Sequence, residues 1–198
     1  MSTCNCGTKT CKRTASEVLK EEHRVIERVL DAMGRMLAHA WVDEQFLIKA
    51  LDFLRNFADG CHHAKEEGEL FPILESAGVP RQGGPIGCLT SEHEEGRRLL
   101  ATIEANLDGA ERHVPGAVVA VRRAVAEYIA LLRQHIEKED SVLFVMADHL
   151  LGAHEQDLML KAFDRAEHEN GNVGKHERYL ALAEELANWE FDLVSEST

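Results

Sequence analysis

Two pairs of histidine and glutamate, His62 with Glu66 and His135 with Glu139, stand four residues apart within otherwise apolar helical stripes. Residues four apart share one helix face, so each pair projects together. Burying an imidazole and a carboxylate costs free energy unless they pair or bind a metal ion. About two such spacings are expected by chance with 11 histidines and 35 acidic residues. Five such spacings occur, which is a small excess over chance. The stronger argument is that these two pairs lie on the apolar stripes.

An internal repeat strengthens this interpretation. The segments HHAKEEGELF (62–71) and HIEKEDSVLF (135–144) align without gaps, which places His62 on His135 and Glu66 on Glu139. Each segment follows a helical stretch with one histidine on its inner stripe, His23 in the first half and His93 in the second. The repeat therefore predicts a pseudo-symmetric site of four histidines and two glutamates.

Four amphipathic helices must position these side chains. Apolar residues recur at steps of three and four from near Thr14, from Asp43, from Pro85 and after Pro115. Thr14 with Glu17 fits a capping box, and Asp108-Gly109 is expected to end the third helix. The pattern predicts an all-α, antiparallel up-down four-helix bundle over residues 14–150. Residues 1–13 are expected to be a flexible cysteine-containing tail, and 151–198 a helical hairpin packed on the bundle.

Composition limits the classes of partner. The 22 basic and 35 acidic residues give a net charge of −13, so we expect binding to neither nucleic acid nor an anionic membrane. No apolar segment resembles a signal peptide or a membrane span, which predicts a cytoplasmic protein. Two interpretations fit Cys4, Cys6 and Cys11: a specific thiol or soft-metal role, and a flexible tail of reducible cysteines. Three thiols are one fewer than a structural metal site usually has, so the second is preferred. Cys61 and Cys88 are interpreted as small core residues, and Tyr128 as a core side chain.

The motifs EEHRVIERVL, CHHAKEEGELFPIL, SEHEEGRRLL and QHIEKEDSVLF resemble, in this order, the hemerythrin-like HHE cation-binding proteins over about residues 14–150. The resemblance implies a non-haem di-iron centre bridged by two glutamates and an oxygen species. It assigns terminal ligands to His23, His62, His93 and His135, and bridging roles to Glu66 and Glu139. Imidazole and carboxylate ligands also suit manganese and zinc, so iron follows from the resemblance alone.

One departure from the family concerns a fifth histidine. Oxygen-carrying members have two histidines one turn apart on the third helix, whereas Leu89 and Arg97 flank His93 at that spacing here. Water, a small anion or another side chain is left to fill the position, with His63, Glu67 and Glu69 nearby in the sequence. A regular helix puts His63 on the polar face of Asp59, so His63 is interpreted as solvated.

These residues support several functions. The leading hypothesis is a di-iron protein that binds a small ligand: dioxygen, nitric oxide or peroxide. The second is a peroxidase or nitric oxide-reducing enzyme that takes electrons from an outside donor, and reductant-dependent turnover would distinguish it. The third is a redox, iron or oxygen sensor that acts through the cysteine tail or the extension. A helical bundle without metal is the fourth. The sequence does not determine the oligomeric state.

Overall fold

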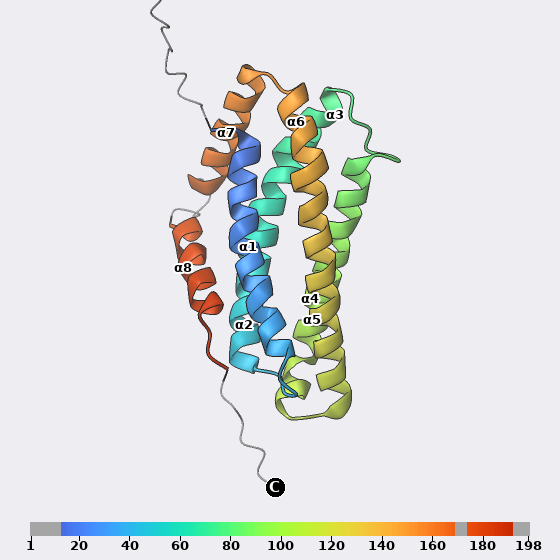
Figure 1. Cartoon of the computed structure of the whole chain (residues 1–198), viewed down its shortest axis with the longest axis vertical. Helices are drawn as coiled ribbons and strands as arrows, with labels where there is room; N and C mark the ends of the chain where they lie inside the picture. The colour runs from blue at the N-terminus through green and yellow to red at the C-terminus, as the bar shows by residue number, and fades with distance from the viewer. Residues whose placement is uncertain (1–12, 169–173, 192–198) are drawn as a thin grey trace, which may run out of the picture.

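The computed structural model describes residues 13–168 and 174–191, so Cys4, Cys6 and Cys11 lie outside the described residues. Four long helical rods lie side by side and alternate in direction (Figure 1). The first is α1 (Ala15–Leu37), the second spans residues 44–76, the third is α4 (Pro85–Glu111) and the fourth spans residues 115–150. The all-α, antiparallel four-helix bundle is therefore confirmed.

Helix starts follow the expected sequence signals. The Thr14 hydroxyl accepts a hydrogen bond from the Glu17 N–H, and the Glu17 carboxylate accepts one from the Thr14 N–H, which completes the capping box. Asp43 caps the second rod through the N–H of Phe46. Pro85 and Pro115 each occupy a first helical position, where the missing N–H costs nothing.

The expected end of the third helix at Asp108-Gly109 is wrong, because α4 continues to Glu111. A Cβ atom on Gly109 would lie 2.8 Å from the Cβ of Ala117 at the start of α5 (Pro115–Lys138). The glycine therefore permits a close approach of two helices rather than ending one. The turn is made two residues after α4, where His113 adopts a positive φ of 58°.

Two of the rods contain π-helical segments. The second rod runs through α2 (Glu44–Phe53), η1 (Leu54–His63), η2 (Glu66–Leu70) and α3 (Phe71–Ser76). The fourth runs through α5, η3 (Glu139–Leu143) and α6 (Phe144–Leu150). In a π-helical turn each N–H bonds to the carbonyl five residues back, so the turn is wider than in an α-helix. The inner face of the second rod therefore departs from the regular helical pattern near His62 and His63.

The apolar core is divided into two clusters by a layer of buried polar residues. One cluster contains Ile26, Phe57 and Tyr128, and the other contains Leu19, Phe71 and Phe144. His23 lies on α1 between Leu19 and Ile26, at the level where the clusters meet. The polar layer is thus closed above and below by packed apolar side chains.

Two shorter helices, α7 (Ala153–His168) and α8 (Lys175–Ala187), pack along the outside of α1 and the second rod (Figure 1). The Tyr179 hydroxyl of α8 donates a hydrogen bond to Asp52, and the ammonium group of Lys49 pairs with Glu185. None of the described helices combines the length and the apolar composition that crossing a membrane requires.

Candidate metal centre

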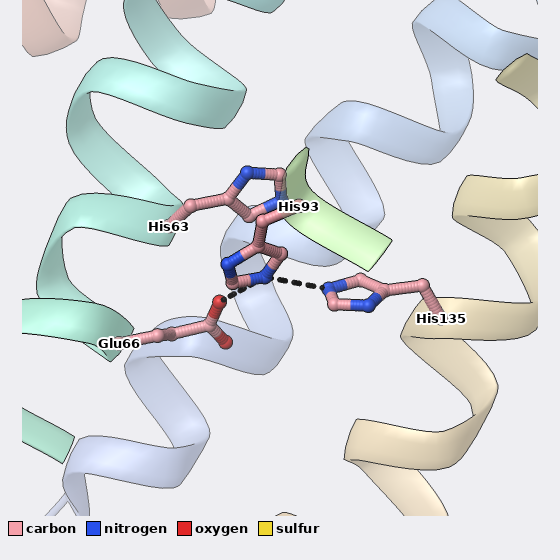
Figure 2. Close-up of side chains that lie close together, drawn as sticks. All are labelled: His63, Glu66, His93 and His135. Atoms are coloured by element: carbon pink, nitrogen blue, oxygen red, sulfur yellow. Dashed lines mark hydrogen bonds and ion pairs between the residues drawn. The ribbon is translucent and has the colours of Figure 1, made fainter. Parts of the chain in front are cut away.

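The polar layer contains two groups of potential metal ligands, each with one atom per residue within 4.8 Å of the others. The first group comprises His23, His62, Glu66 and Glu139, and the second comprises His63, Glu66, His93 and His135. All of these side chains are buried, and together they come from all four rods. Figure 2 shows the second group converging, with His63 and Glu66 from the second rod, His93 from α4 and His135 from α5. The structure thus brings together all six residues expected from the sequence and adds a seventh, His63.

The side-chain atoms that face one another in this layer have few partners. The Nε2 atoms of His23, His62 and His63 and all four oxygens of Glu66 and Glu139 are buried without a hydrogen bond. The Nε2 atoms of His93 and His135 lie 3.1 Å apart. If both rings were neutral with their protons on Nδ1, the lone pairs of the two Nε2 atoms would face and repel each other. Buried groups of this kind need a cation or protons between them. The donor set fits metal ions coordinated by nitrogen and oxygen.

The two glutamates link the two groups. Glu66 places Oε1 at 3.5 Å from His62 Nε2 and Oε2 at 3.5 Å from His93 Nε2. Glu139 places one oxygen, Oε2, 3.2 Å from both His23 Nε2 and His135 Nε2. Each carboxylate therefore lies between a histidine of the first group and a histidine of the second.

A carboxylate orients every one of the five rings through the other ring nitrogen. The Nδ1 contacts are His23–Asp140 at 2.8 Å, His62–Glu22 at 3.0 Å, His63–Asp59 at 3.3 Å, His93–Glu67 at 2.7 Å and His135–Glu92 at 3.1 Å. A carboxylate accepts only from a protonated nitrogen, so these contacts favour the Nδ1–H tautomer and leave Nε2 free. Metal-binding histidines are held in this way.

Basic side chains pair with these outer carboxylates in turn. Lys65 donates to Glu22, Arg24 to Asp140 and Lys138 to Glu92, while Arg97 donates to both Asp59 and Glu67. The negative charge of the outer carboxylates is thus balanced locally. Around the layer, the histidine rings contact the outer carboxylates, and these contact the basic side chains.

The internal repeat extends to these outer residues. Glu22 and Glu92 each precede the inner-stripe histidine of their half, and each accepts from the repeat histidine, His62 or His135. Lys65 and Lys138 occupy equivalent repeat positions and bind these two glutamates. The two halves of the repeat also contact each other, because Phe71 of the first half stacks on His93 of the second and Phe144 of the second stacks on His23 of the first.

His63 breaks the symmetry and corrects the sequence interpretation. Its side chain was expected in solvent, but it is buried and its ring stacks on that of His93 with centroids 3.9 Å apart. The expected neighbour is present, since Nδ1 contacts Asp59, yet α4 covers this face with His93 against His63 and Arg97 against Asp59. Ile136 stands at the equivalent place in the second repeat. The signal available in the sequence was the pair of adjacent histidines at positions 62 and 63.

Burial and neighbouring charges shift the pKa values of this layer strongly. Burial and repulsion from Glu139 raise the pKa of Glu66 well above its usual range. Burial opposes the charged form of Glu139 too, but His135 and His23 lower its pKa well below that range. Burial lowers the pKa of His135, yet Glu139 and Glu92 outweigh it and raise the value to about 9. Burial and the charge of His23 lower the pKa of His62 to about 4. Without metal, protons thus take over part of the charge balance.

Three other side chains named from the sequence lie near the layer. Tyr128 is buried in the core as expected. Cys88 is not a core residue, because it is exposed, and its thiol lies 3.6 Å from Glu92. Cys61 is partly buried, and burial raises the pKa of its thiol to about 11. A protonated thiol is a poor nucleophile and metal ligand.

A four-helix bundle whose rods all contribute histidines or carboxylates to one buried layer defines a class of helical metal-binding proteins. The model of the hemerythrin HHE cation binding domain matches residues 14–147, and the chain belongs to this family. The resemblance inferred from the four motifs is thereby confirmed.

Several relatives share part of the chain. An uncharacterized protein of Mycobacterium tuberculosis is 29% identical over 159 residues, covering 78% of this chain and 62% of its own length. An iron–sulfur cluster repair protein, YtfE, of Edwardsiella ictaluri is 33% identical over 103 residues, covering 51% of this chain and 46% of its own. The chain thus spans less than two thirds of either relative. No solved structure matches the chain at a significant level.

Proposed function

We propose that this protein holds two non-haem iron ions in the polar layer and binds a small ligand there: dioxygen, nitric oxide or peroxide. The main support is the set of five Nε2 atoms and two carboxylates that face one another without partners sufficient to satisfy them. His23 and His62 would hold one ion, and His63, His93 and His135 the other. Glu66 and Glu139 would serve both, since each lies beside histidines of the two groups.

Iron is proposed on family grounds together with the ligand chemistry. Imidazole and carboxylate suit iron, manganese and zinc. Relatives named for iron–sulfur cluster repair support an iron-linked role, and the family model is one of cation binding. Two ferrous ions held close together would supply two electrons to a bound small molecule.

The side chains themselves would bind, orient and exclude water. The outer carboxylates fix the rings, and the apolar clusters on either side restrict solvent. The first position has two histidines and the second three, so the first retains more room for a ligand that the protein does not supply. We propose that the small ligand binds on the side of His23 and His62.

The test is the metal content per chain of protein purified without added metal, compared with a His62→Ala/His135→Ala variant. We expect about two irons in the wild type and loss of both in the variant, because one ligand is removed from each group. A His149→Ala/His154→Ala variant, altered at two exposed positions, controls for histidine number. Wild-type protein that takes up no metal even after anaerobic ferrous loading would overturn the proposal.

A second candidate is an enzyme that reduces peroxide or nitric oxide with electrons from an outside donor. The group with only two histidines favours it, because an iron that the protein does not fully coordinate could react with peroxide or nitric oxide. Steady turnover of peroxide or nitric oxide with a chemical reductant, abolished in the double variant, would support it. Reversible ligand binding without turnover would leave the binding function and exclude this one.

A further inference from the structure

Lys65 differs from the other basic residues that pair with the outer carboxylates. Its side chain is 1% exposed, whereas those of Arg97, Lys138 and Arg24 are 39%, 44% and 56% exposed. Water reaches the other three side chains and solvates them in part. A buried ammonium group depends on protein partners for its solvation.

The partners of Lys65 come from two parts of the chain. The ammonium nitrogen lies 2.5 Å from Glu22 Oε1 on α1 and also pairs with Glu167 on α7. It lies 5.6 Å from the ring centroid of Phe163, which is likewise on α7. The C-terminal extension therefore provides one of the two counter-charges and part of the cover over this lysine.

The Lys65 ammonium lies beside a cluster of potential metal ligands. Ligand atoms of Glu22, Cys61, Glu167 and His176 lie within 4.8 Å of one another, an arrangement that could itself hold a metal ion. The Lys65 ammonium, however, pairs with both carboxylates of the group. His176 of α8 faces the same two carboxylates, its Nδ1 lying 3.9 Å from Glu22 and 3.7 Å from Glu167.

Glu22 connects this ion pair to the candidate metal layer. Its Oε1 accepts from Lys65, and its other oxygen, Oε2, lies 3.0 Å from Nδ1 of His62. Burial opposes its charge, but His62 and Lys65 outweigh burial and lower its pKa to about 2. With one oxygen fixed by the lysine, the other is aimed at the ring. Lys65 and His62 thus contact opposite oxygens of one carboxylate.

The second half of the repeat offers an internal comparison. Lys138 binds Glu92, and Glu92 orients His135, in the same way. The Lys138 ammonium pairs with Glu92 on α4 rather than with a carboxylate of the extension, and its side chain is half exposed. The two halves therefore differ in that the extension contributes a counter-charge to Lys65 on the His62 side.

We propose that the C-terminal helices are a working part of the metal centre, because Glu167 holds Lys65, Lys65 holds Glu22, and Glu22 orients His62 toward the metal. This inference rests on the proposed metal site. Lys65 and Glu167 are positioning residues in this chain of contacts. The extension then regulates the metal position of His23 and His62, where the small ligand is proposed to bind, and leaves the other position unaffected.

The experiment compares full-length variants loaded with ferrous iron under anaerobic conditions, and follows iron release to a colorimetric chelator. Lys65→Met keeps the length of the side chain and removes its charge. Glu167→Gln removes the counter-charge on α7 at a partly exposed position, so it folds even where the first variant does not. Glu185→Gln is the matched control, since it removes an exposed ion pair between the extension and Lys49. Lys138→Met is the equivalent change in the second half.

We expect one of the two irons to leave about 10- to 100-fold faster in Lys65→Met, the range typical of outer-sphere substitutions. Glu167→Gln should accelerate the same phase by about threefold or more, and Glu185→Gln should leave both phases unchanged. Lys138→Met should have the smaller effect of the two lysine variants, because water can replace its ammonium. In metal-free protein, imidazole ¹⁵N shifts of His62 should lose the uniform Nδ1–H form in Lys65→Met.

Three results would overturn the inference separately from the proposed function. Wild-type release in both Lys65→Met and Glu167→Gln, from chains holding two irons, would overturn the inference alone. Equal acceleration of both irons, or an equal effect of Glu185→Gln, would show general loosening of the fold and would also overturn it. A wild-type chain that holds no iron would overturn the proposed function together with this inference.

Discussion

The ring of His63 lies flat against the ring of His93, with centroids 3.9 Å apart and planes inclined by 14°. A single guanidinium group supports both rings, because Arg97 donates to Asp59 and to Glu67, which contact the Nδ1 atoms of His63 and His93. Two neighbouring imidazoles are therefore fixed as one unit at one end of the polar layer.

The first prediction concerns His63 itself. His63→Ala should remove one ligand of the three-histidine position and weaken iron binding there by more than about 100-fold, the upper end for an outer-sphere change. One iron per chain should remain on purification, as measured by elemental analysis. His154→Ala, at an exposed position, is the control. Two irons bound with wild-type affinity in His63→Ala would show that this ring is only a packing residue.

Arg97 and Arg98 allow a test with adjacent residues of the same type. Arg97 joins the two carboxylates behind His63 and His93, whereas Arg98 pairs with Glu95 on the surface. Arg97→Leu should weaken one iron by about 10- to 100-fold, and Arg98→Leu should change stability by less than about 0.5 kcal/mol and leave iron binding unaltered. The measurement is competition with a chelator of known affinity. Equal effects of the two substitutions would contradict the role of Arg97.

The sequence predicted the bundle and six of the seven inner-layer residues because helical periodicity and the repeat both depend on spacing along the chain. His62 and Glu66 were identified in this way. His63 was missed because π-helical turns change which residues face inward without changing the spacing. The outer carboxylates could have been found, since Glu22 and Glu92 occupy equivalent positions before His23 and His93. The contact between Lys65 and Glu167 depends on how the extension docks, which no local pattern encodes.

Phe144 offers a test of how the apolar cover supports the layer. It is fully buried and stacks on His23 with centroids 5.4 Å apart, while its neighbour Val145 is 42% exposed. Phe144→Ala should lower the free energy of unfolding of the metal-free chain by about 3–5 kcal/mol, because it leaves a cavity. Val145→Ala should lower it by less than about 0.5 kcal/mol. Denaturant unfolding followed by circular dichroism measures both, and similar losses would contradict the packing argument.

The last prediction concerns pH, for which metal-free and metal-loaded protein should respond in opposite directions. Glu139 and Glu92 outweigh burial and raise the pKa of His135 to about 9, above the ordinary value of 6.5. This raised pKa stabilises the metal-free fold fully below pH 6.5, and the contribution is lost as the pH rises through 9. Metal must displace the same proton, so metal affinity should rise by about tenfold per pH unit from this proton alone until about pH 9.

Titration calorimetry in buffers of different ionisation enthalpy measures the proton count directly. We expect at least about one proton released per chain at pH 7, because His135 is protonated there in the metal-free protein. Glu92→Gln removes one of the charges that raise the pKa of His135, so the pH range of proton release should move downward. Metal binding that releases no proton at pH 7, with an affinity unchanged between pH 6.5 and 9, would show that His135 is already neutral. The raised pKa would then play no part in loading, and the charge balance of the metal-free layer would have to rest on Glu66 instead.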